Sequence, residues 1–132
     1  MLRLSRLADY GVLLMTRVPF DPTASAITAR ELSEQTGLPW PTVGKILKDL
    51  SRAGLLASRR GQGGGYRLAR PATEISLAEV VGAIDGPVDL TCCAEANESC
   101  ALTIDCPVRD RLAVVSRVVH DALAQVTLAE MR

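Results

Sequence analysis

Histidine and aromatic residues are scarce in this sequence. It contains one His, one Trp, two Tyr and one Phe among 132 residues. There is no Ser/His/Asp or Cys/His arrangement and no pair of carboxylates in an apolar setting, so we do not expect an enzyme or a small-molecule substrate. The apolar residues are chiefly Leu, Val, Ala and Ile, a composition that suits helices packed on helices.

Long apolar runs are also missing. No run approaches the roughly 18 to 20 apolar residues that cross a bilayer, so no membrane partner is expected. Charged residues interrupt the apolar ones between Met1 and Asp9, which is not the pattern of a signal peptide. We therefore expect a cytoplasmic chain that forms one compact domain, or a small domain with an arm.

Cysteine is absent from the first 91 residues and then occurs four times within fifteen, at Cys92, Cys93, Cys100 and Cys106. Closely spaced thiolates can converge on one soft metal centre or iron–sulfur cluster. Cytosolic thiols stay reduced, which favours metal binding over disulfides. The alternatives are a surface loop that happens to hold thiols, or a pair of disulfides.

The net charge of zero hides an asymmetry between the two halves of the chain. Residues 1–70 hold eleven Lys/Arg and five Asp/Glu, whereas residues 71–132 hold four and ten. The balance is therefore +6 in the first half and −6 in the second. A basic half joined to an acidic half suggests one part that meets a polyanion and one that does not. A solvated charged surface is the alternative explanation.

The basic half carries a helix-turn-helix pattern. Apolar residues at helical spacing from Leu4 to Val18 predict a first helix. Thr28 and Glu31 form a capping-box pattern before a second helix that ends at Gly37. A third helix is predicted between a proline at its first position and a closing glycine, Pro41 and Gly54. Its inward positions are apolar (Val43, Ile46, Leu47, Leu50), and its outward positions are polar (Thr42, Lys45, Lys48, Asp49, Arg52). This pairing of helices is typical of DNA-binding proteins.

A basic hairpin follows the third helix. Residues 55–60 and 66–70 read as strands, and the glycine-rich residues 61–65 read as the turn between them. Arg59 and Arg60 are then placed to reach phosphates or the minor groove of duplex DNA, as the wing of a winged helix does. No Gly-Lys-Ser/Thr follows the glycines, which excludes a P-loop. A plain flexible hairpin is the alternative.

Two further helices are predicted beyond the hairpin. Ser76 and Glu79 form a second capping-box pattern before a helix that ends at Gly86. The last helix carries a nearly heptad apolar stripe: Val108, Leu112, Val115, Val119, Ala122 and Val126. Such a stripe is typical of a contact with a partner helix, so we expect a homodimer. Folding back onto the first helix is the alternative. The expected organisation is a DNA-binding domain (1–86), a cysteine loop (87–106), and a dimerisation helix with its tail (107–132).

Three of these segments together resemble one known family. They are residues 59–66 with the three wing glycines, residues 76–85, and the cysteine loop. In combination they are similar to the IscR/NsrR family of dimeric winged-helix transcription regulators, from Leu4 to about Met131. Within it the chain looks closest to the branch that regulates SUF iron–sulfur assembly genes. The resemblance implies a mainly α fold, duplex DNA as partner, and an iron–sulfur cluster, either [2Fe-2S] or [4Fe-4S].

The resemblance also implies the cluster ligands. It places Cys93, Cys100 and Cys106 at the three ligand positions, with Cys92 as the alternate to Cys93. The spacing between Cys93 and Cys100 is one residue longer than is usual in the family. The histidine that follows the last cysteine in the cluster-assembly branch is replaced here by Arg109.

The fourth ligand is therefore expected elsewhere. The nitric-oxide-sensing branch uses an aspartate in the first helix of the partner subunit, and the segment Leu4–Asp9 resembles that region. Asp9 is accordingly the expected fourth ligand, although an ordinary carboxylate in a first helical turn is the alternative. His120, the single histidine, is far along the last helix and is expected to be a surface or packing residue.

The function we expect is a DNA-binding regulator that senses cluster status or redox and nitrosative stress. Thr42, Lys45, Lys48, Arg59 and Arg60 are its expected DNA contacts. One alternative is a regulator of the same fold that senses through thiols or a partner protein, without a cluster. Another is an iron–sulfur carrier with no DNA role, against which the basic first half argues.

Overall fold

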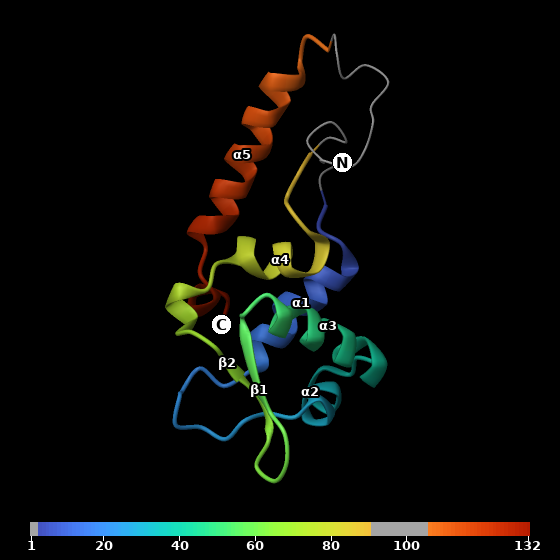
Figure 1. Ribbon diagram of the computed structural model, residues 1–132, viewed down its shortest axis with the longest axis vertical. Coiled ribbons are helices and arrows are strands. Elements are labelled where there is room, and N and C mark those ends of the chain that lie inside the picture. Colours follow the sequence, from blue (N-terminus) through green and yellow to red (C-terminus); the bar gives the residue numbers. More distant parts are fainter. Residues whose placement is uncertain (1–2, 91–105) are drawn as a thin grey trace.

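Helices dominate the computed structural model, which describes residues 3–90 and 106–132 (Figure 1). In chain order its elements are α1 (Arg6–Arg17), α2 (Ala29–Thr36), α3 (Trp40–Arg52), β1 (Leu56–Arg59), β2 (Gly65–Leu68), the 3-10 helix η1 (Ala72–Glu74), α4 (Leu77–Asp85), α5 (Arg109–Gln125) and the 3-10 helix η2 (Leu128–Met131). This is the predicted winged helix-turn-helix with a long C-terminal helix. We call residues 3–85 and 126–132 the body and α5 the arm.

The helix starts follow the local sequence signals. The Thr28 hydroxyl accepts from the Glu31 N–H at 3.2 Å, and the Glu31 carboxylate accepts from the Thr28 N–H at 2.7 Å. Ser76 and Glu79 repeat this arrangement at the start of α4, at 3.2 and 2.8 Å. Both predicted capping boxes are confirmed. Helix α3 has no side-chain cap and begins at Trp40, so Pro41 occupies its second position rather than its first.

The core lies where α1, α2, α3 and α4 meet. The four predicted inward residues of α3 are fully buried: Val43, Ile46, Leu47 and Leu50. They pack in one apolar cluster with Leu14 and Met15 of α1 and Leu32 of α2. Because these four apolar residues of α3 face the core, Lys45, Lys48 and Arg52 are left on the outside.

The wing is a two-stranded antiparallel hairpin braced from behind. Strands β1 and β2 pair from Leu56 with Leu68 to Arg59 with Gly65. Ile27, ahead of α2, exchanges backbone hydrogen bonds with Tyr66, at 3.1 and 2.7 Å. A Cβ at Gly65 would stand 2.5 Å from the Ile27 carbonyl oxygen, so only glycine permits this close approach. The segment before α2 thus fixes the wing against the helix-turn-helix.

The chain after α5 returns to the body, which the sequence patterns did not predict. Leu128 is 2% exposed and belongs to the core cluster. Its N–H donates to the Ile75 carbonyl and the Leu77 N–H donates to the Val126 carbonyl, both at 2.8 Å. The Arg132 guanidinium lies 4.8 Å over the ring of Phe20. The tail is therefore packed with the body, while the boundaries proposed at 86 and 106 stay a prediction.

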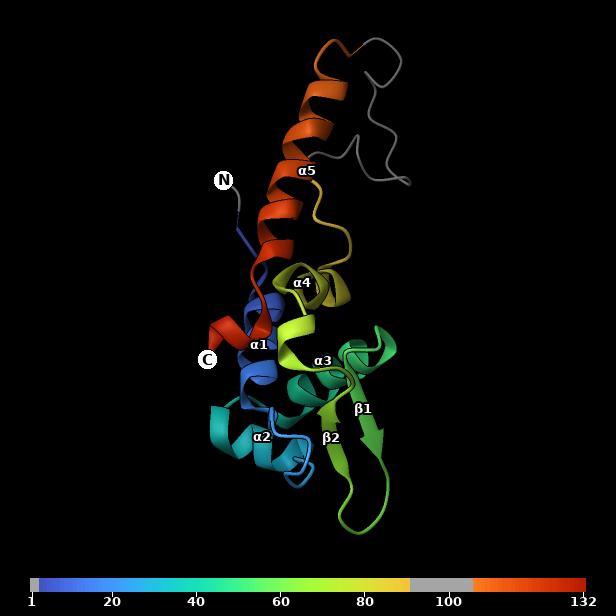
Figure 2. The ribbon, with the colours of Figure 1, turned by 90° about the vertical axis from the view of Figure 1, so that its left-hand side faces the viewer.

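The arm extends from the end of the body opposite to the wing (Figures 1 and 2). The buried Ser116 faces the segment after α4, where its Oγ accepts from the Leu90 N–H at 3.1 Å. Along the predicted stripe, Leu112 and Val119 are half-buried while Val115 and Ala122 are exposed. α5 also carries apolar residues outside this stripe, such as Val114 and Val118. The spacing in the sequence therefore did not show which face of the helix is buried.

None of the helices in the described parts of the chain is both long and apolar enough to cross a membrane.

Candidate nucleic-acid interface and cysteine segment

Helix α3 presents a basic ridge to solvent. Lys45, Lys48 and Arg52 are exposed on the side opposite to the buried face. The Lys45 ammonium is paired with the Asp49 carboxylate, one turn further on, at 3.2 Å. Lys48 and Arg52 have no ion pair within residues 3–90 and 106–132, so their charge is available to a polyanion.

The wing adds two further cations beside this ridge. Arg59 ends β1 and Arg60 follows it, and both are exposed. Together with Lys48 they line one notch of about 350 Å³ between α3 and the wing. The structure thus brings three of the five expected DNA contacts to one place. Lys45 lies further round the ridge, and Thr42 is half-buried on the edge of α3 away from the wing.

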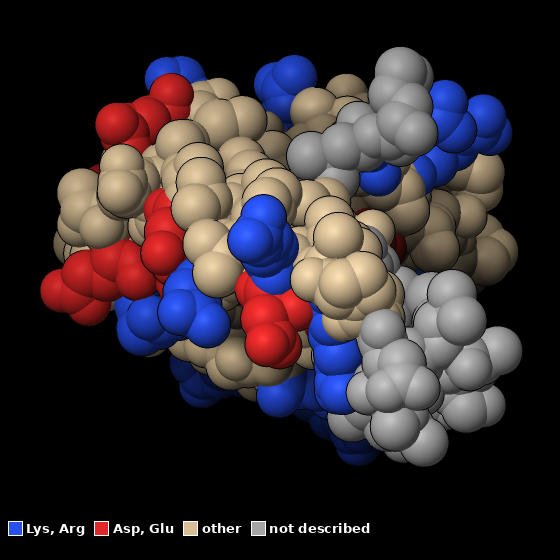
Figure 3. Space-filling view, turned by 90° about the horizontal axis from the view of Figure 1, so that it is seen from above, with Lys and Arg blue, Asp and Glu red and all other residues tan. Residues whose placement is uncertain are grey.

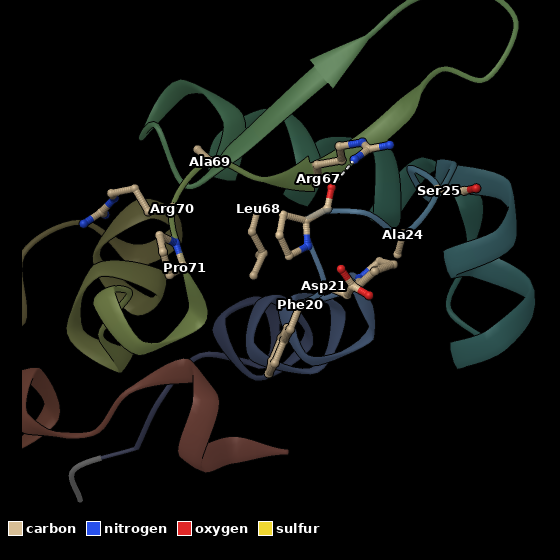
Figure 4. Close-up of a pocket in the computed structure, with 11 residues that line it drawn as sticks. Phe20, Asp21, Ala24, Ser25, Arg67, Leu68, Ala69, Arg70 and Pro71 are labelled. Carbon is tan, nitrogen blue, oxygen red and sulfur yellow. Dashed lines mark hydrogen bonds between the residues drawn. The ribbon is translucent and has the colours of Figure 1, made fainter.

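Other arginines of the basic half have structural partners. Arg67 on β2 donates to the Pro22 carbonyl at 2.8 Å, across a pocket of about 400 Å³ that Phe20, Leu68 and Pro71 also line (Figure 4). Arg70 forms a 2.5 Å ion pair with Glu79. These contacts join β2 and the residues after it to the loop after α1 and to α4. The two arginines therefore stabilise the position of the wing and are weaker candidates for binding a polyanion.

The end of the molecule opposite to the wing has a different character. Seen from there, Asp/Glu and Lys/Arg side chains are interspersed over the described surface (Figure 3). Charges of both signs give a weaker field than a set of unpaired cations. The notch side is therefore the better candidate for contact with a polyanion.

Sequence patterns missed three residues of α3 that are exposed or line the notch. Trp40, in the first turn of α3, has 66% of its surface exposed although it is the single tryptophan of the chain. Gly44 and Ser51 line the notch from α3. Trp40 could have been singled out because it is an aromatic residue beside the predicted start of the helix. No local pattern singles out Gly44 or Ser51.

Most of the cysteine segment lies outside the described residues, including Cys92, Cys93 and Cys100. Cys106 is half-buried, and its carbonyl accepts from the Arg109 N–H at the start of α5. Within residues 3–90 and 106–132, no three His, Cys, Asp or Glu side chains are grouped as metal ligands are. A centre built on Cys106 therefore requires ligands from outside these ranges or from a second subunit.

The expected fourth ligand, Asp9, is exposed in the first turn of α1. This turn lies beside α4, whereas α5 begins at the far end of the arm (Figure 1). His120 is also exposed, and its Nδ1 lies 3.4 Å from the Asp121 carboxylate. It is eleven residues along α5 from Arg109, roughly 16 Å of helical rise. His120 is accordingly far from Cys106 of its own subunit.

A hydrogen bond joins the start of α1 to the end of α4, which precedes the cysteine segment. Ser5, the N-cap of α1, donates its hydroxyl to the Asp85 carboxylate at 2.6 Å. The same hydroxyl accepts from the Ala8 N–H at 3.0 Å. Asp85 is the last residue of α4, immediately before the segment that leads to the cysteines. The start of α1, which carries Asp9, is thus fixed relative to the start of that segment.

The described residues form a basic winged helix with an arm, and the sequence before the arm is rich in cysteine. A model of the Rrf2 family, described as iron-dependent transcriptional regulators, matches residues 4–132. The chain belongs to the Rrf2 family. Members of this family are transcription regulators and not enzymes, which confirms the reading of the sequence on that point.

Two bacterial relatives illustrate the similarity within the Rrf2 family. The regulator IscR of Vibrio vulnificus is 32% identical over 130 residues, which are 98% of this chain and 77% of that protein. A helix-turn-helix regulator of Mycobacterium tuberculosis is 38% identical over 87 residues, 66% of this chain. That match covers 54% of the Mycobacterium protein, so the chain spans about half the length of this relative.

A solved structure of another bacterial protein has a similar fold. The oxidized form of CymR from Staphylococcus aureus matches with a TM-score of 0.71 and 27% identity, over 98% of this chain and 95% of that one. The winged helix-turn-helix with a long C-terminal helix is thus a shared architecture. The similarity to IscR extends over nearly the whole chain.

Proposed function

We propose that this Rrf2-family chain is a dimeric transcription regulator that binds duplex DNA with α3 and the wing. The observation that carries the proposal is the convergence of Lys48, Arg59 and Arg60 on one notch, without acidic partners in the described residues. Arg67, the arginine of β2, donates instead to a backbone carbonyl, so it is left out of the proposed contact set. Lys45 and Thr42 complete the proposed contact set on the outer side of α3.

The arm is the proposed dimer contact. Val114, Val115 and Val118 are exposed along one side of α5, and Val118 has 62% of its surface exposed. Contiguous valines on an exposed helix face are typical of an interface with another helix. A second copy of the chain is the proposed partner, because two recognition helices are then placed to meet successive major grooves, roughly 34 Å apart.

The cysteine segment is the proposed cluster site. Cys93, Cys100 and Cys106 are its proposed thiolate ligands, with Cys92 as alternate to Cys93 and Asp9 of the partner subunit as fourth ligand. The position of α1 beside α4, away from the start of α5, supports a ligand across the dimer rather than within one subunit. When bound, an iron–sulfur cluster supplies a centre that oxidants and nitric oxide attack. The genes controlled are proposed, from the resemblance, to be those of iron–sulfur cluster assembly.

Two contacts of the described residues provide a path from this segment to the DNA surface. Asp85 holds the N-cap of α1, and Leu128 anchors the far end of α5 in the core that α3 fills. We expect a change in how the cysteine segment is held to reach the start of α1 and the end of α5. The proposed outcome is a shift in the relative placement of the two recognition helices.

The cluster is tested by purifying the protein without oxygen and recording its visible absorption, with iron and sulfide assayed on the same sample. Matched iron and sulfide with a brown colour are expected. Asp9→Ala is then expected to make the colour more labile, with Asp121→Ala, another exposed helical aspartate, as the control. A protein that stays colourless after reconstitution with iron and sulfide contradicts the proposed cluster. That result would not contradict the proposed DNA binding.

A thiol switch without a cluster is the second candidate. It is favoured by the similarity to a CymR structure described as an oxidized form. Four thiols within fifteen residues also allow disulfides or stepwise oxidation. A colourless protein whose DNA affinity changes with peroxide and recovers with a thiol reductant supports this candidate.

A further inference from the structure

A pocket of about 400 Å³ lies beside the wing, between the end of β2 and the loop after α1 (Figure 4). Its volume is that of roughly thirteen water molecules, within the range of sites that bind small molecules. Phe20, Leu68 and Pro71 contribute apolar surface to its lining. Arg70 also lines it, but its charge is neutralised by the ion pair with Glu79. None of the lining residues belongs to the proposed DNA contacts or to the cysteine segment.

Two side chains of opposite charge line the same pocket, and no ion pair joins them within residues 3–90 and 106–132. Arg67 donates one hydrogen bond, to the Pro22 carbonyl, so most of its five N–H donors have no partner in the described residues. Asp21 accepts from the Thr23 N–H and hydroxyl through Oδ1, both at 2.7 Å, and its Oδ2 has no partner in that part of the chain. Figure 4 shows both side chains toward one end of the pocket and Pro71 toward the other.

The loop that carries Asp21 is held in place by its own hydrogen bonds. Besides the two bonds from Thr23, the Ala24 N–H donates to the Asp21 carbonyl at 3.1 Å. The Thr23 hydroxyl and then the Thr23 N–H hold the pKa of Asp21 below its ordinary 3.8, so the carboxylate is charged at neutral pH. Phe20 and Leu68 are half-buried against the core cluster. The charges and the apolar surface are therefore positioned before a ligand binds, which lowers the cost of binding.

We infer that this pocket binds a free α-amino acid with an apolar side chain. The ligand carboxylate accepts from the Arg67 guanidinium, whose planar fork suits a carboxylate, and the ligand ammonium donates to the Asp21 carboxylate. The ligand side chain lies against Phe20 and Leu68, where burial of apolar surface stabilises the complex. A ligand with a charge of one sign only is repelled by Asp21 or by Arg67. The inference does not depend on the proposed DNA binding.

The first test is isothermal titration calorimetry of the full chain with L-leucine, L-methionine and L-phenylalanine. At least one of the three is expected to bind once per chain with a Kd below about 1 mM. For the tightest of them, the analogue without the ammonium and the analogue without the carboxylate are each expected to bind about tenfold more weakly. Absence of binding by all three amino acids up to about 10 mM overturns the inference. Equal binding of the two analogues and the amino acid overturns it too.

The second test places the amino acid in this pocket. Asp21→Asn keeps the size of the side chain and removes its charge, and it is expected to weaken binding about tenfold, as is Arg67→Gln. Arg30→Gln, at an exposed arginine of α2 outside the pocket, is the control and is expected to bind as the wild type does. Unchanged affinity of Asp21→Asn overturns the inference, whether or not Arg67→Gln folds. Neither result bears on the proposed DNA binding, because Asp21 and Arg67 are not among its contacts.

Discussion

The buried tail predicts a large loss of stability when Leu128 is replaced by alanine. Leu128 is 2% exposed in the core cluster, although it lies beyond the arm in sequence. The change removes three carbon atoms, worth about 0.8 kcal/mol each on burial. The cavity adds about 1 kcal/mol, so the free energy of unfolding is expected to fall by about 3 kcal/mol.

Urea denaturation at one fixed protein concentration measures this loss. With a slope of about 1.5 kcal/mol per molar, the midpoint of Leu128→Ala is expected about 2 M below that of the wild type. The control is Met131→Ala in the same 3-10 helix, which is 42% exposed and is expected to change stability by less than about 0.5 kcal/mol. If the Leu128→Ala midpoint matches the wild type, the tail is not part of the core.

Three further substitutions test the wing, the arm and a capping box. Arg59→Ala is expected to weaken DNA binding and to reduce the slope of affinity against salt by about one unit, because one phosphate contact is lost. Unchanged affinity removes Arg59 from the contact set. Val118→Glu is expected to convert the dimer to a monomer in light scattering, whereas Arg117→Glu on the neighbouring position leaves a dimer. Hydrogen bonds from the Thr28 N–H and then its hydroxyl hold the pKa of Glu31 below the ordinary 4.5. Its contribution to stability is therefore present above about pH 4.5 and is lost as pH falls through its lower folded-state pKa, so Glu31→Gln is expected to show a smaller acid-induced fall. An equally steep fall in Glu31→Gln contradicts that role.

Local signals explain what the sequence predicted well. The capping boxes at Thr28 and Ser76, and the buried face of α3, each depend on residues within a few positions of one another. Such interactions are readable because a helix brings positions three and four apart together. The wing was predicted from an equally local signal, since the glycine-rich residues 61–64 separate two short strands.

Long-range contacts explain what the sequence patterns did not predict. The hydrogen bond between Ser5 and Asp85 joins residues 80 apart, and no local pattern specifies such a pair. The packing of Leu128 was overlooked although Thr127 and Glu130 repeat the capping-box signal. On α5, spacing alone could not show that Leu112 is half-buried while Val115 is exposed, because burial depends on the residues packed against the helix.

The most direct test of the central claim compares DNA affinity with cluster content in one preparation. Protein purified without oxygen is divided, iron is removed from one half with a chelator, and both halves are assayed for iron, sulfide and affinity for a duplex that the protein recovers from a randomised pool. The account predicts affinities that differ at least tenfold, within the usual range of coupling between two sites. Equal affinities at full and zero iron content contradict regulation through a cluster.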